Sequence, residues 1–106
     1  MLTFYLLPDD APRPSRMRLD ELPKAGELSA EDFAELQTQR IIESRLDYDQ
    51  DFRWSNGVAQ MKLQLLLHRH PQLRPDGVST PEQRLLVLLL NASAADSGLL
   101  AVALEA

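Results

Sequence analysis

Three aspartates at alternate positions, Asp47, Asp49 and Asp51, are the densest group of potentially functional side chains in this sequence. They lie in the segment 45–54, RLDYDQDFRW, where side-chain character alternates strictly. Successive side chains of an extended chain point to opposite faces, so an extended conformation would separate two sets of residues. One set is charged and the other is apolar, aromatic or amide-bearing: Arg45, Asp47, Asp49, Asp51 and Arg53 against Leu46, Tyr48, Gln50, Phe52 and Trp54. The alternation therefore predicts an extended segment, either a strand or a loop lying on the core.

The same segment is the candidate binding surface. Carboxylates spaced along a strand suit a cationic partner, and Tyr, Trp and Arg dominate the energetics of protein interfaces. The residues that we predict to contact a partner are Asp47, Tyr48, Asp49, Asp51, Arg53 and Trp54. The alternative is purely structural: the apolar set packs inward and the charged set is a solvated face.

Calcium binding is the other chemistry that this spacing suggests, because Asp47-x-Asp49-x-Asp51 matches the first three ligand positions of an EF-hand loop. The sixth position of such a loop requires glycine and here is Phe52. The twelfth requires a bidentate glutamate and here is Val58. The sequence therefore predicts no metal site.

Catalytic motifs are absent as well. His68 and His70 stand two apart, which on a helix directs them about 200° away from each other, so they cannot share one ion. No Gly-x-Ser-x-Gly elbow, glycine-rich phosphate loop or His-Glu-x-x-His pair occurs. We expect a protein that is not an enzyme and uses no cofactor.

Charge is distributed unevenly along the 106 residues. Residues 28–54 carry seven acidic and three basic side chains, which accounts for most of the net charge of −5. A negative field of this kind repels phosphate backbones and attracts basic surfaces, so we expect a basic protein partner and no nucleic acid. The absence of cysteine and the interruption of the apolar stretch 85–104 by Asn91, Ser93 and Asp96 predict a cytoplasmic protein without a membrane span.

The elements expected around the candidate surface make one α+β domain over residues 1–106. The apolar ends, 1–7 and 99–104, read as strands too short to stand alone, so we expect them to pair in one small sheet packed by about three helices. Three N-cap signals mark the helices, at Ser29, Ser55 and Thr80, and Gly98 fits the left-handed residue that closes the last one. The first helix is expected within 28–44, and the proline-rich stretch 8–27 reads as a surface loop. In the second helix Val58, Met61, Leu65 and Arg69 share a face while Leu63 and Leu67 point elsewhere, which predicts burial on two sides.

In size, missing cysteines and concentrated negative charge, the chain resembles in general character the small acidic immunity proteins that bacteria use to neutralise toxin enzymes. The resemblance implies an inhibitor that masks a basic partner through the acidic and aromatic segment. Two alternatives stay open. One is a self-associating structural or adaptor module that uses a sheet edge or the leucine-rich helices. The other is a small-molecule-binding domain with Tyr48 and Trp54 in its pocket.

Overall fold

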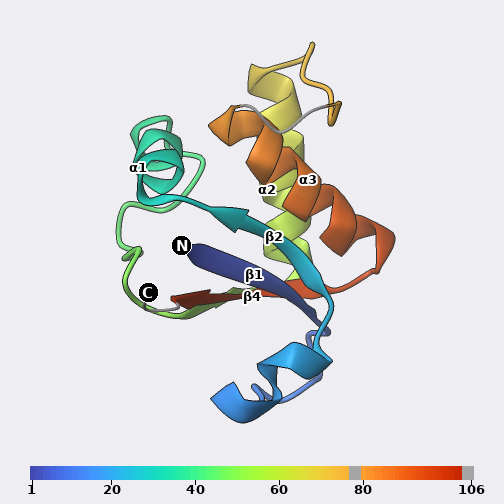
Figure 1. Ribbon diagram of the computed structural model, residues 1–106. Coiled ribbons are helices and arrows are strands. Elements are labelled where there is room, and N and C mark those ends of the chain that lie inside the picture. The colour runs from blue at the N-terminus through green and yellow to red at the C-terminus, as the bar shows by residue number, and fades with distance from the viewer. Residues whose placement is uncertain (77–79, 104–106) are drawn as a thin grey trace.

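A computed structural model describes residues 1–76 and 80–103 of the chain. Within these residues, four antiparallel strands form one sheet in the order β2-β1-β4-β3 (Figure 1). Their bounds are Leu2–Leu7 for β1, Lys24–Leu28 for β2, Phe52–Trp54 for β3 and Gly98–Ala103 for β4. The two terminal strands, β1 and β4, pair from Leu2↔Ala103 to Leu7↔Gly98 in the middle of the sheet. The α+β class and the pairing of the ends are therefore confirmed, while residue 104 of the predicted last strand lies outside the described residues.

The helices begin where the capping residues predict. They are α1 (Ala30–Thr38), α2 (Asn56–Arg69) and α3 (Pro81–Ala94). The side chains of Ser29, Ser55 and Thr80 accept hydrogen bonds from backbone amides three residues later, and Ser29 forms a full capping box with Asp32. Each cap satisfies an amide that the first turn leaves without a partner.

The first helix is shorter than the stretch 28–44 in which it was expected. After α1 ends at Thr38, Arg40 adopts a φ of 61°, in the left-handed region. This turn carries Ile41 and Ile42 back into the core, where the two side chains are 1% and 0% exposed. The burial of two large aliphatic side chains offsets the cost of a left-handed non-glycine residue, which is of order 1–3 kcal/mol.

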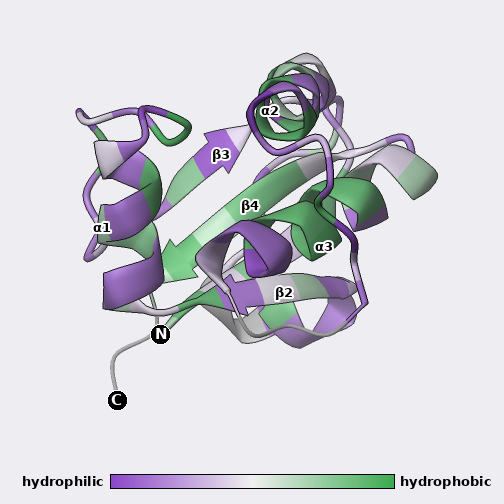
Figure 2. Cartoon of the chain, turned by 90° about the horizontal axis from the view of Figure 1, so that it is seen from above, coloured by the Kyte–Doolittle hydropathy of each residue, from purple (hydrophilic) through white to green (hydrophobic). Residues whose placement is uncertain are grey.

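The helices cover one face of the sheet, as the view from above shows (Figure 2). On the other face lies a 3-10 helix, η1 (Arg16–Glu21), which places Leu19 against Leu7, Leu100 and Val102 (Figure 1). The stretch 8–27, which was expected to be a surface loop, therefore also contains η1 and four residues of β2. This stretch supplies both a covering layer for the second face and most of the edge strand β2, because its apolar residues find partners that only the tertiary fold provides.

Two predictions about local environment also fail. The helix α2 buries Ala59, Lys62 and Leu66 and packs Val58, Leu63 and Leu65 partly against the core. Met61, which was expected on a buried face, is 70% exposed. Gly98 does not close α3; Asp96, with a φ of 52°, takes the left-handed position instead. Glycine is required at 98 for a different reason, since a Cβ there would lie 2.4 Å from the Trp54 carbonyl oxygen.

Candidate functional site

The segment 45–54 is extended only at its end, where Phe52–Trp54 forms the edge strand β3; the residues before it make turns. The sorting of side chains nevertheless follows the alternation closely. Of the even set, Leu46, Tyr48, Phe52 and Trp54 contribute to the main core and Gln50 is exposed. Of the odd set, only Asp51 is partly buried, and Arg45, Asp47, Asp49 and Arg53 are exposed. We call residues 43–51 the acidic loop.

Aromatic contacts fix the inner side of the acidic loop. The Tyr48 ring lies 5.8 Å from the Phe33 ring of α1, measured between centroids. The Phe52 ring lies 5.2 Å from Trp54, which in turn lies 5.5 Å from Phe4 of β1. Trp54 is only 3% exposed, so in this structure it supports the loop from within the core.

Hydrogen bonds fix the backbone of the acidic loop. The Gln37 side-chain amide donates to the carbonyl oxygens of Glu43, at 3.0 Å, and Leu46, at 2.9 Å. Within the loop, the Asp47 carboxylate accepts from the Asp49 amide at 3.0 Å. Asp47 and Asp49 are thus exposed on a turn whose conformation is set before any partner arrives.

Two other predicted contact residues join the loop to the rest of the chain. Asp51 accepts from the Ala103 amide at 2.8 Å, next to the end of the described chain, and forms an ion pair with Arg13. Arg53 donates to the Pro8 carbonyl oxygen at 2.6 Å and to that of Asp9 at 3.2 Å. Both side chains therefore hold the segment 8–13 against the sheet in this structure.

A buried lysine beneath the loop was missed by sequence reasoning. Lys62 of α2 is 8% exposed, donates to the Ile41 carbonyl oxygen at 3.0 Å and forms an ion pair with Glu43. Its ammonium lies 4.8 Å from the centre of the Trp54 ring, and the Trp54 indole N–H donates to Glu43 at 3.3 Å. Burial lowers the pKa of Lys62 from 10.5 to about 8, so desolvation outweighs the attraction of the carboxylate. No sequence pattern predicts the cluster of Lys62, Glu43 and Trp54, because a single lysine in a helix normally faces solvent.

Further carboxylates lie at the same end of the molecule. Glu31 and Glu35 are exposed on α1, which stands beside the acidic loop in both views (Figures 1 and 2). The inward-facing acids of the region have cationic partners from elsewhere in the chain: Asp32 pairs with Arg84 at 2.7 Å, and Glu43 pairs with Lys62. The exposed acids Glu31, Glu35, Asp47 and Asp49 form what we call the acidic end.

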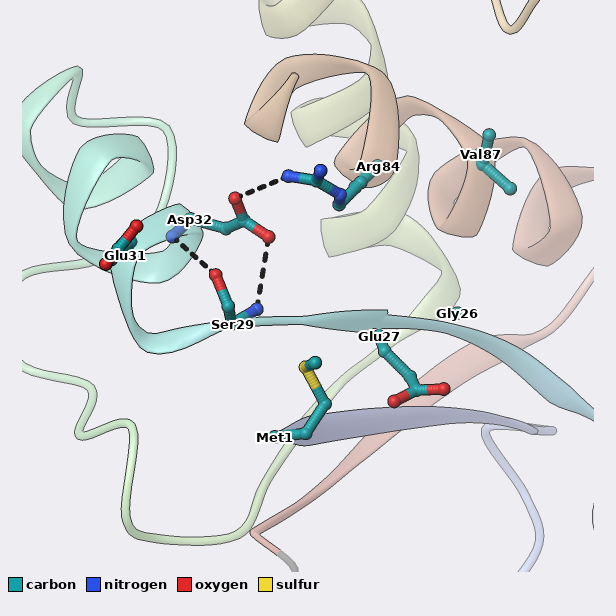
Figure 3. A pocket seen from close by; sticks show the side chains of 8 residues that line it. All are labelled: Met1, Gly26, Glu27, Ser29, Glu31, Asp32, Arg84 and Val87. Carbon is teal, nitrogen blue, oxygen red and sulfur yellow. Dashed lines mark hydrogen bonds and ion pairs between the residues drawn. The ribbon is translucent and has the colours of Figure 1, made fainter. Parts of the chain in front are cut away.

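A pocket of about 510 Å³ opens between the start of α1, strand β2 and helix α3. Arg84 and Asp32 meet at its upper rim, where Asp32 also accepts from the Ser29 amide at 3.1 Å, and Glu27 lies across from them (Figure 3). Met1, Gly26 and Val87 contribute less polar surface, and Glu31 also lines the pocket. The mixed charges of this pocket suit a polar ligand, but Asp32 and Arg84 already satisfy each other. None of the predicted contact residues lines it.

Comparison with known proteins places the chain in no group. No protein-family description matches the sequence, and no curated protein or solved structure is significantly similar to it. Within residues 1–76 and 80–103, no group of three or more potential metal ligands comes together. In the same part of the chain, no helix is both long and apolar enough to cross a membrane.

Proposed function

We propose that this protein binds and masks a basic protein partner through its acidic end, in the manner of a small cytoplasmic inhibitor or immunity protein. The observation that carries the proposal is the rigid presentation of Asp47 and Asp49. Both are exposed, and the turn that bears them is held by Gln37 and by the packing of Tyr48. A loop that is ordered before binding loses little conformational entropy on association.

Electrostatics support the same reading. The net charge of −5 gives the molecule a long-range attraction for cationic proteins, which raises association rates at low ionic strength. Arg45 lies in the acidic loop and Arg53 follows it, so the surface combines carboxylates with guanidinium groups. Mixed charges of this kind discriminate between partners, because an unmatched arrangement places like charges together.

The experiment is affinity capture from a lysate of the source organism, with the wild-type protein and the double variant Asp47→Asn/Asp49→Asn as baits. Asparagine keeps a side-chain oxygen that can accept from the Asp49 amide, so the turn is retained while two charges are lost. We expect wild type to retain a protein of high isoelectric point that the double variant retains at least tenfold less well. The affinity of the purified pair is then measured by calorimetry at two salt concentrations.

The matched control is Asp10→Asn/Asp76→Asn, which removes the same charge from two exposed loop positions that are not part of the acidic end. We expect this control to bind as wild type does, apart from a small loss from the lower net charge. Equal capture by all three baits, or a partner whose affinity does not depend on salt, would show that the acidic end is not the binding surface.

A further inference from the structure

The outward face of α2 combines exposed apolar side chains with an absence of exposed charge from Asn56 to His68. From Asn56 to His68 the helix has one charged residue, Lys62, and that residue is buried. Besides Met1, the large exposed hydrophobic side chains of the described chain are Met61 and Leu67, 70% and 39% exposed, and both lie on α2. Depletion of charge together with exposed methionine is characteristic of the centre of a protein interface.

The exposed residues of α2 form a stripe suited to helix pairing. Gly57, Met61, Gln64 and His68 recur at the spacing i, i+4, i+7 and i+11, which places them on one face. All four are exposed, and Figure 2 shows α2 at the margin of the helical layer with its outer side uncovered by other elements. A Cβ built on Gly57 would meet only the Ser55 hydroxyl, at 3.9 Å, so this end of the stripe is open.

We propose that this face binds a second copy of the chain, with the two α2 helices antiparallel about a twofold axis between Met61 and Gln64. In such a symmetric contact each pair of residues occurs twice. Met61 of one copy then meets Gln64 of the other, and His68 meets Gly57, whose missing side chain leaves room for the imidazole. The stripe is therefore complementary to itself in this register.

The distribution of charge around α2 favours antiparallel pairing of two copies. Two molecules of net charge −5 repel each other, and the α2 face allows them to meet without bringing exposed carboxylates into the contact. At the start of α2, Asp9 accepts from the Asn56 amide at 2.8 Å, whereas Arg69 lies exposed at its end. Antiparallel pairing places the basic end of each helix beside the acidic start of the other, and it opposes the two helix dipoles favourably.

The contact is small. A helix of 14 residues is about 21 Å long, which is less than a standard-sized interface requires. We therefore expect a dissociation constant of about 10–100 µM. Sedimentation equilibrium over a concentration series should show the average mass rising from 12.0 kDa toward twice that value.

Two variants test the register. Met61→Glu introduces a carboxylate at the centre of the contact. Gly57→Leu fills the space for His68, and its Cβ would be 3.9 Å from the Ser55 hydroxyl, which is ordinary contact. Each should weaken dimerisation at least tenfold, with an unchanged circular dichroism spectrum. Ala34→Glu adds the same charge on the exposed side of α1 and should leave the dimer intact.

A wild-type protein that stays monomeric at about 1 mM, well above the expected dissociation constant, would overturn the proposal. In that case the exposed face of α2 would be a binding surface for a different protein. A dimer that survives either Met61→Glu or Gly57→Leu would overturn it equally, because the contact would then lie elsewhere. Neither result bears on the acidic end, whose variants are tested separately.

Discussion

At the scale of single residues, the burial of Lys62 is the main feature that the sequence did not predict. Lys62 occupies a buried position in α2, and it joins that helix to the acidic loop through Ile41 and Glu43. A charged side chain in this position is retained at the cost of desolvation, which hydrogen bonds and an ion pair only partly offset. Its effect on stability should therefore depend on pH.

Stability should rise between pH 8 and 10.5. The pKa of Lys62 is about 8 in the folded chain and near 10.5 when the chain unfolds, so between these values the unfolded state binds more protons. The free energy of unfolding then increases with pH, by a total of roughly 3 kcal/mol for a shift of this size. Urea denaturation across this range measures the increase. In Lys62→Met, which replaces the ammonium with an apolar group, the Lys62 contribution should vanish.

The difference between the two pH profiles isolates the contribution of Lys62, because every other ionisable side chain is present in both proteins. Parallel profiles for wild type and Lys62→Met would mean that the lysine keeps an ordinary pKa in the folded chain. The Glu43 ion pair would in that case compensate fully for burial.

At the scale of elements, the sequence predicted where helices begin far better than where they end. Ser29, Ser55 and Thr80 act as caps through contacts within three residues, so their effect is visible in the local sequence. The left-handed residues Arg40 and Asp96 are not glycines, and no local signal reveals them. Each follows the end of its helix, where the next residue closes the turn: the Ile41 amide donates to the Leu36 carbonyl oxygen, and the Ser97 amide donates to that of Ala92.

In the segment of the acidic loop, too, some features could be predicted from the sequence and others could not. Alternation predicted the inward packing of the apolar side chains of segment 45–54, because amphipathic sorting is a property of the sequence itself. It was wrong for Gln50, which is exposed, and for Asp51, which is partly buried. It did not predict that only Phe52–Trp54 would join the sheet, since the turns before β3 depend on Gln37, a residue of another element. Whether the exposed part of the segment binds a partner stays a prediction.

Replacing Gln37 with methionine should loosen the acidic loop. Methionine has a similar length but no donor, so the carbonyl groups of Glu43 and Leu46 would lose their hydrogen bonds. We expect a loss of about 1–2 kcal/mol in the free energy of unfolding and faster amide hydrogen exchange in residues 43–50. Gln72→Met, at an exposed position, is the control. Unchanged exchange in the loop would show that Tyr48 and Lys62 suffice to hold it.

At the scale of the whole molecule, the fold has three layers rather than the two that the sequence suggested. The helices bury one face of the sheet, and the segment around η1 buries the other (Figure 1). The composition of residues 8–27 did not indicate a third layer, because four prolines and mixed charges are typical of exposed loops. Ala11, Leu19 and Leu22 are apolar residues through which this stretch contacts the sheet face lined by Leu7 and Val102.

Leu19→Ala tests whether the third layer contributes to stability. Leu19 is 8% exposed and packs on Leu7, Leu100 and Val102, so its truncation leaves a cavity against the sheet. We expect a loss of at least about 2 kcal/mol in the free energy of unfolding, the usual range for a buried leucine being 2–5 kcal/mol. Leu67→Ala, at a position 39% exposed, is the matched control and should cost clearly less. Urea denaturation compares the two, and equal losses would mean that the proline-rich segment rests on the sheet without stabilising it. A larger loss for Leu19 would show that the segment around η1 stabilises the fold by covering the second face of the sheet.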